Sequence, residues 1–287
     1  MRKLLLSIGL LCLACTAFAQ SLLWRVSGRD LKVSSYLYGT IHIQDKRVFA
    51  FDSTVWHCFN SCDALAVEVL LDRLDYSTVR EKMLLPEGQS LVKMLSKEDL
   101  AVLDSLCKAK LGVGVIFLGN MKPFFLSSAL QQADLPKEMP LALDLFFLQQ
   151  ARNRGMYCYG LEDYMDQIKA TDAITLDDQL KILRQTLHET GDVAASFDSL
   201  TLAYLAFDLE TITKMLDDTM LPDNFRRVLV EKRNQTMYKG FRKLAKKQRV
   251  FCAVGAAHLP GDKGLIGLLR KKGYTVEPVN FEWNVDR

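Results

Sequence analysis

The protein has 287 residues, of which 49% are hydrophobic and 25% are charged, and its formal net charge is +3 at pH 7. This near balance of charge gives no electrostatic basis for binding nucleic acid, so no nucleic-acid partner is expected. The length suits one large domain with a buried core.

The first 19 residues have the pattern of a secretory signal peptide. A basic start is followed by an apolar run from Leu4 to Phe18, and Ala17-Phe18-Ala19 is a small-residue cleavage pattern. The apolar run is shorter than the roughly 20 residues of a membrane-spanning helix. We therefore expect residues 20–287 to be the mature, exported protein, either periplasmic or secreted. Lipid attachment at Cys15 is the alternative, and contact with a membrane is expected only in that case.

Five cysteines remain after the predicted cleavage, so at least one thiol is unpaired. Most of them lie in apolar segments and are expected to be small buried hydrophobic residues, although export leaves a disulfide open as an alternative. They are Cys58, Cys62, Cys107, Cys158 and Cys252. Cys58 and Cys62 are nearest in sequence but are poorly placed for a disulfide if both lie on one helix.

The first quarter of the mature chain predicts a strand, a loop, a helix and a second strand. Residues 22–26 and 33–38 have the composition of short strands, and 51–61 is amphipathic. The apolar run 64–70 is typical of a buried parallel strand. This order resembles the opening of a βαβ unit.

From about residue 75 to 247 the pattern is mostly helical, interrupted by a predicted strand at 156–160. Helices are expected over 100–111, from Pro123, and over 143–154, 176–190, 197–217 and 222–247. The chain then predicts a strand at 249–254, a helix at 262–272 and a strand at 274–279. The expected fold is α/β. Its mixed or mostly parallel sheet comes from the N- and C-terminal thirds, within a single domain over 20–287 that carries a helical insert at about 75–247.

Two copies of the pattern Gly-x-x-His lie near opposite ends of the chain, at Gly39–His42 and Gly255–His258. Each follows a predicted strand, and the chain has only four histidines. Ligand sites in α/β sheets lie at the carboxyl ends of the strands. The two motifs therefore predict one site assembled from both ends of the sequence.

Glu68 is the best carboxylate to complete such a site, because it interrupts an apolar strand pattern and a buried, unpaired Glu is costly. Two imidazoles and one carboxylate commonly hold a divalent metal, which activates a water for hydrolysis. The ligands would be His42, Glu68 and His258, with zinc, manganese, cobalt or iron left open. Glu68 would instead be a catalytic base if it is not a ligand. The alternative to a metal site is that Glu68 faces outward and the two histidines have only structural roles.

Four other residues are candidates for supporting roles. Arg233 lies in a predicted helix, where it would stabilise an oxyanion or Glu68, and Asn234 follows it. Asp144 and Glu162 are candidates to orient the histidines, with plain structural roles as the alternative.

The other two histidines are weaker candidates for the site, and the absence of several motifs argues against several enzyme classes. His57 and His188 have the settings of ordinary helical histidines. The sequence has no His-Glu-x-x-His, Gly-x-Ser-x-Gly, phosphate loop or dinucleotide fingerprint. This excludes an ordinary zincin and speaks against a serine hydrolase and against nucleotide cofactors.

Taken together, these segments resemble proteins of the TraB/GumN family. The matching segments are Tyr36–His42, the predicted strand with Glu68, Leu161-Glu162 with Gln167, Arg233-Asn234, and Val254–Leu259 followed by Gly261, Gly264 and Gly273-Tyr274. The resemblance covers essentially the whole mature chain and extends to the Tiki metalloproteases. It implies a ChaN/EreA-like fold and metal-dependent hydrolysis of peptide bonds, with His42, Glu68 and His258 as the functional residues.

The expected function is that of an exported metal-dependent hydrolase acting on a peptide or protein, with Arg233 as an electrophilic helper. Two alternatives stay open. A ChaN-like protein would bind haem or iron, with Tyr38, His42 and His258 as ligands. A non-catalytic accessory factor of the cell envelope would use the histidines only to hold its fold.

Overall fold

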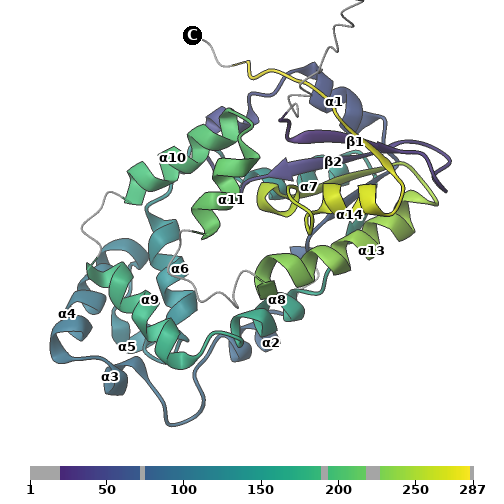
Figure 1. The fold of residues 1–287 in the computed structure, drawn as a ribbon. Helices are drawn as coiled ribbons and strands as arrows, with labels where there is room; N and C mark the ends of the chain where they lie inside the picture. Colours follow the sequence, from purple (N-terminus) through teal and green to yellow (C-terminus); the bar gives the residue numbers. More distant parts are fainter. Residues whose placement is uncertain (1–19, 72–74, 189–192, 218–226, 285–287) are drawn as a thin grey trace, which may run out of the picture.

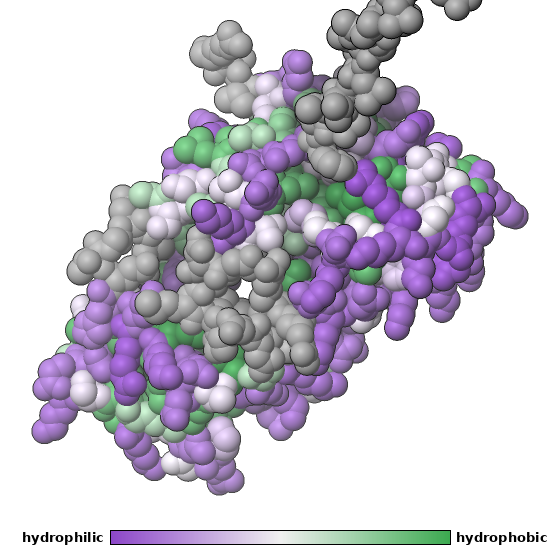
Figure 2. Space-filling model, viewed as in Figure 1, coloured by the Kyte–Doolittle hydropathy of each residue, from purple (hydrophilic) through white to green (hydrophobic). Residues whose placement is uncertain are grey.

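The computed structural model describes residues 20–71, 75–188, 193–217 and 227–284. The predicted signal peptide and Cys15 lie outside these ranges, so export and lipidation stay predictions. One part of the molecule contains the sheet and the other is built from helices (Figure 1). The outer surface in this view is mostly hydrophilic, with hydrophobic patches on both parts (Figure 2). None of the helices within the described ranges is long and apolar enough to cross a membrane.

The sheet has six strands in the order β4-β3-β5-β2-β1-β6. They are β1 (Leu23–Ser27), β2 (Ser35–Thr40), β3 (Ala64–Val67), β4 (Tyr157–Gly160), β5 (Val250–Gly255) and β6 (Thr275–Pro278). Strands β4, β3, β5 and β2 are parallel to one another, whereas β1 is antiparallel to both β2 and β6. The expected α/β fold with a mixed sheet is confirmed. Strand β4 belongs to this sheet although it lies within the predicted helical insert at about 75–247.

Helices surround the sheet and build the second part of the molecule (Figure 1). The α-helices are α1 (Ser53–Asn60), α2 (Tyr76–Lys82), α3 (Leu91–Met94), α4 (Lys97–Leu106), α5 (Val115–Leu118), α6 (Pro123–Ala133), α7 (Leu143–Asn153), α8 (Tyr164–Thr171), α9 (Leu176–His188), α10 (Val193–Leu205), α11 (Leu209–Asp217), α13 (Arg233–Ala245) and α14 (Leu265–Lys271). Shorter segments are the 3-10 turns η1 (Lys46–Phe49) and η5 (Ala256–His258) and the π-helical turns η3 (Cys107–Leu111) and η4 (Arg227–Lys232).

Two expectations about element boundaries are wrong. The strand predicted over 64–70 ends at Val67, because the chain turns across the end of β4, where a Cβ on Gly160 would lie 3.2 Å from the backbone nitrogen of Leu70. Glu68 therefore follows β3 and is not part of it. The helix predicted over 197–217 is two helices, because Phe207 adopts a left-handed conformation with φ of 60° and breaks the helix.

The two parts of the molecule have separate hydrophobic cores. The core of the helical part is formed by residues of α3, α4, α6 and α9 and their connections, including Leu91, Leu103, Leu126 and Leu183. The core around the sheet is rich in aromatic rings. All five described cysteines are buried and unbridged, as expected for small hydrophobic side chains.

Phe147 of α7 is at the centre of the aromatic packing on the sheet. Its ring is completely buried and lies 5.2 Å from the ring of Tyr38 and 5.3 Å from that of Phe251, centroid to centroid. These contacts join α7 to β2 and β5, the two strands that precede the Gly-x-x-His motifs.

We predict that Phe147→Ala lowers the free energy of unfolding by about 3–5 kcal/mol, because it removes a buried ring and leaves a cavity. Equilibrium unfolding in urea measures the change. Ile116→Ala is the control, since Ile116 is 81% exposed and its truncation removes no core contact. Equal effects of the two substitutions would contradict the packing described here.

Candidate active site

The predicted site residues meet at the carboxyl ends of the parallel strands β2, β3 and β5. His42 lies two residues after β2, Glu68 directly follows β3, and His258 ends the η5 turn after β5. Tyr36 to Thr40 of β2 pair in parallel with Phe251 to Gly255 of β5, so the two motifs leave the sheet side by side. The sheet therefore brings together residues that are more than 200 positions apart in sequence.

The glycine of each motif permits a close approach. A Cβ on Gly39 would lie 2.9 Å from Cδ1 of Leu259 and 3.1 Å from Cα of Ala256. A Cβ on Gly255 would lie 3.2 Å from Oε1 of Glu68. Real side chains rarely tolerate such contacts, so the first glycine lets the two motifs pack together and the second leaves room for the carboxylate.

The Glu68 carboxylate is held on both of its oxygens. Oε1 accepts a hydrogen bond of 2.7 Å from the backbone N–H of Gly255, and Oε2 accepts one from Nη2 of Arg233. Burial opposes ionisation of Glu68, but neighbouring His258, Arg233 and His42 outweigh it and lower the pKa to about 2. Glu68 is therefore a carboxylate at neutral pH.

Arg233 also binds a second buried carboxylate. Its Nε donates to Oε2 of Glu162 at 2.8 Å, so one guanidinium serves two acidic residues. Burial raises the pKa of Glu162, against the effect of Arg233. Gln167 on α8 reaches the same group, with Nε2 3.5 Å from a carboxylate oxygen of each glutamate. Arg233 thus links the start of α13 to the ends of β3 and β4.

His258 is buried and oriented by Asn234. Nδ2 of Asn234 donates to the carbonyl of Lys263 at 2.9 Å, which leaves Oδ1 as the acceptor for the Nδ1–H of His258 at 2.7 Å. Burial lowers the pKa of His258 to about 4, although Glu68 opposes this. The imidazole is therefore neutral at pH 7, and its Nε2 lone pair lies 3.7 Å from Oε1 of Glu68.

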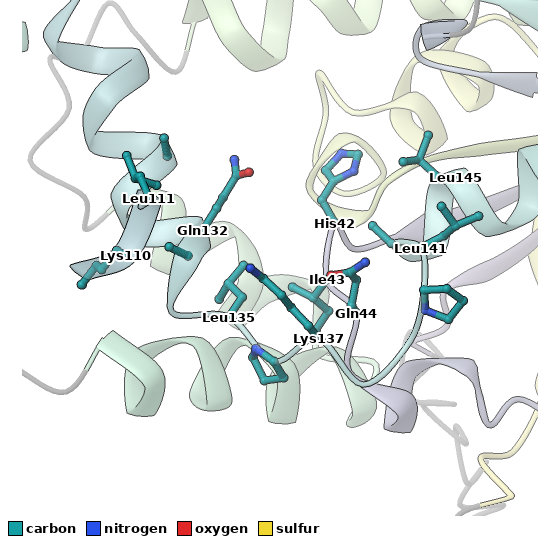
Figure 3. Close-up of a pocket in the computed structure, with 15 residues that line it drawn as sticks. His42, Ile43, Gln44, Lys110, Leu111, Gln132, Leu135, Lys137, Leu141 and Leu145 are labelled. Carbon is teal, nitrogen blue, oxygen red and sulfur yellow. The ribbon is translucent and has the colours of Figure 1, made fainter. Parts of the chain in front are cut away.

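The protonation state of His42 is opposite to that of His258. Its Nδ1 lies 2.9 Å from Oδ1 of Asp144 in the first turn of α7, and its side chain is 61% exposed. Partial desolvation lowers the pKa of the imidazole, but Asp144 outweighs this and, with Glu68, raises the pKa to about 9. His42 therefore carries a positive charge at neutral pH and faces a pocket (Figure 3).

The structure brings together seven of the eight residues that the sequence singles out, and Tyr38 is the exception. Tyr38 is completely buried in the aromatic core, where its ring packs on Phe51, Phe147 and Phe251. It is therefore not positioned to ligate iron from the site. The other two histidines lie elsewhere, as expected: His57 is on α1, and His188 pairs with Asp99 at 2.6 Å.

Two contacts of the site could not be found in the sequence. The backbone N–H of Gly255 and the carbonyl of Lys263 carry no side-chain signal, yet one holds Glu68 and the other orients Asn234. In the part of the chain that the structure describes, no three histidine, cysteine or acidic side chains are grouped as metal ligands. Glu68 and His258 are adjacent, whereas His42 is directed to Asp144.

Comparison with known proteins identifies relatives over most of the chain. The model of the TraB/PrgY/gumN family matches residues 22–278. Metalloprotease TIKI2 of Danio rerio is 25% identical over 321 residues, covering 90% of this chain and 60% of the relative. Metalloprotease TIKI1 of Homo sapiens is 22% identical over 321 residues, covering 90% of this chain and 61% of the relative. The chain thus spans about three fifths of the length of these relatives. No solved structure matches it.

We predict that Asn234→Asp raises the pKa of His258 from about 4 toward the ordinary value near 6.5, because a carboxylate at this position favours the imidazolium. Proton NMR titration of the imidazole resonances in protein treated with a chelator measures this pKa, and His258→Ala assigns the signal. The imidazole resonances of His57, on a different element, are the internal control. An unchanged pKa of His258 would show that Asn234 does not govern its protonation.

Proposed function

The chain belongs to the TraB/PrgY/gumN family, and from this premise we propose that it is a metal-dependent hydrolase that cleaves peptide bonds. The relatives named metalloproteases support the reaction class. The proposed metal ligands are Glu68, His258 and His42, and the proposed substrate is a peptide or protein.

The observation that carries the proposal is a pair of hydrogen-bond acceptors that face each other. Nε2 of neutral His258 and Oε1 of ionised Glu68 are 3.7 Å apart, and the hydrogen on His258 is on the other nitrogen. Two lone pairs at this distance repel unless a cation lies between them. Ligand atoms about 2.1 Å from a tetrahedral zinc are roughly 3.4 Å apart, which is close to the spacing observed. These two residues therefore fit a divalent cation, and His42 would complete the set through Nε2 after losing the proton of its imidazolium form.

The local charges also favour a cation. Glu68 and Glu162 are both buried and share the single guanidinium of Arg233. His42 and Asp144 form a separate ion pair with no net charge. When both glutamates are ionised, one negative charge of the cluster is unbalanced, which a bound divalent ion would offset.

The residues around the proposed cation have distinct roles. A divalent cation bound here would lower the pKa of a water toward 7 and polarise the scissile carbonyl. Arg233 and the Gly255 N–H fix the Glu68 carboxylate, and Asn234 fixes the tautomer of His258. Arg233, whose charge is shared by the two glutamates, would donate a hydrogen bond to the carbonyl oxygen on which negative charge develops.

A second candidate is hydrolysis without a metal, favoured by the His42–Asp144 pair. An imidazole whose Nδ1 is held by a carboxylate, and whose ring is exposed to a pocket, has the arrangement of a general base. Neutral His42 would take a proton from water at Nε2, and Asp144 would stabilise the imidazolium. Because the pKa of His42 is raised to about 9, the neutral form and the rate would increase with pH toward this value.

We predict that the purified protein, reconstituted with zinc, manganese or cobalt, binds about one ion per chain, as the proposed three-ligand site requires. His258→Ala and His42→Ala should each reduce bound metal by at least about tenfold, since each removes a proposed ligand. Elemental analysis of protein purified without a metal-affinity tag measures the stoichiometry. His57→Ala is the matched control, because it removes an exposed histidine outside the site.

Hydrolysis of a peptide library, with and without chelator, separates the two candidates. Activity that is lost with the chelator and restored by the metal supports the first. A folded wild type that binds none of the three ions but hydrolyses peptides, with loss of activity in His42→Ala and Asp144→Asn, would replace the first by the second.

A further inference from the structure

Two pockets meet on one face of α6 next to the candidate active site. The first, with a cavity volume of about 560 Å³, is lined by His42 (Figure 3), and the second, of about 390 Å³, is lined by Arg233. Ala129 and Gln132 line both pockets. The pockets are therefore two halves of one groove, and each half reaches a residue of the site.

Helix α6 forms the floor of this groove because its two faces differ. Leu126 and Leu130 are directed into the core of the helical part. Phe125, Ala129 and Gln132 follow at helical spacing on the other face and line the pockets. Figure 3 shows Gln132 and His42 on opposite sides of the first pocket. From Phe125 to Gln132 the helix rises about 10 Å, which is the length of roughly three residues of an extended peptide.

The lining of the groove is basic. Both pockets together are lined by Lys110, Lys137, Arg233 and His42, and no residue of either lining is acidic. Lys110 is paired with Asp134 at 2.5 Å, and Arg233 with the glutamates of the site. Lys137 also lines the groove, and among the residues that the structure describes no acidic side chain pairs with it. A ligand with a carboxylate is favoured there.

Lys137 is held in position relative to the active site. Its backbone pairs in a parallel bridge with Gln44, and the carbonyl of Gln44 accepts a 2.8 Å hydrogen bond from the N–H of Met139. Gln44 lies two residues after His42. The ammonium group is therefore carried by the same wall of the groove as the imidazole.

The second half of the groove combines aromatic and aliphatic side chains with polar ones. Phe124 and Phe125 of α6 line it on one side, and Tyr164 and Ile168 of α8 on the other. Both phenylalanines are only partly buried although their ring centroids are 5.7 Å apart. Such a lining suits a large hydrophobic side chain.

We propose that this groove binds an extended peptide that carries a carboxylate near Lys137 and an aromatic or large aliphatic residue near Phe125, with the reacting bond between them. This inference rests on the proposed function, because it names the substrate of the same site. The carboxylate is either an acidic side chain or the C-terminus of the peptide.

Fluorescence anisotropy with labelled synthetic peptides tests the binding directly. The probes are Ala-Phe-Ala-Ala-Glu-Ala amide and its reverse order, the same peptides with Lys or Gln in place of Glu, and Ala-Phe-Ala-Ala with a free carboxylate. The His258→Ala background suppresses hydrolysis, and His258 lines neither pocket. We expect one of the two orders to bind at least about tenfold more tightly than its Lys counterpart. If a Glu probe binds best, the carboxylate near Lys137 is an acidic side chain. If the free-acid probe binds best, it is the C-terminus of the peptide.

Two groove variants and one matched control define the site. Lys137→Glu should weaken binding of the carboxylate probe by about tenfold and strengthen that of the Lys probe. Ala129→Trp should block both halves and weaken every probe. Lys239→Glu makes the same charge change on an exposed position of α13 outside the groove and should leave all affinities unchanged. Circular dichroism verifies the fold of each variant, and Lys137→Glu alone carries the test if Ala129→Trp does not fold.

The inference is overturned if no probe binds, if Lys137→Glu changes the affinities of acidic and basic probes alike, or if the two lysine variants have the same effect. Its failure is distinct from that of the proposed function. Metal binding and hydrolysis that are insensitive to Lys137 and Ala129 would refute the groove alone. Selective peptide binding by a protein that has neither metal nor hydrolytic activity would support the groove and refute the proposed reaction.

Discussion

The buried carboxylate of Glu68 is the constraint on which the rest of the site depends. A charged group at this depth is costly unless it is paired and hydrogen-bonded, and three elements supply its partners. The Gly255 N–H comes from the end of β5, the guanidinium of Arg233 from the start of α13, and the imidazole of His258 from η5. Of these partners, Arg233 is itself held by Glu162 and His258 by Asn234. The carboxylate thus ties the C-terminal third of the chain to the end of β3.

The neighbouring groups keep the two histidines in different protonation states. His258 is deeply buried beside Asn234, an uncharged partner, and is neutral at pH 7. His42 is exposed and pairs with Asp144, which holds a proton on the ring. The two Gly-x-x-His motifs are alike in sequence, but their chemical roles differ because the partners come from different helices. Asn234 is supplied by α13 and Asp144 by α7.

Much of this arrangement was predictable from the sequence, because strand ends follow from local patterns. The runs before Gly39 and Gly255 are mostly apolar and each ends at a glycine, so the positions of both histidines after strand ends could be inferred. The partners of the histidines could be suggested but not assigned. His42 and Asp144 are 102 positions apart, and only the packing of α7 on the sheet brings them together. Tyr38, the alternative iron ligand, is unsuited to that role because strand geometry directs its ring into the core.

The two separate cores have a consequence for the site. The candidate active site lies in the sheet part, while α6 of the helical part lines the pockets beside it. Leu126 and Leu130 fix α6 within the core of the helical part, so this core sets the orientation of the face with Ala129 and Gln132. In the proposed groove, substitutions on that face would alter which peptide is bound while leaving the Glu68 cluster intact. If the proposed function holds, a reactive centre and a binding wall built around different cores would allow the substrate preference to change without altering the chemistry.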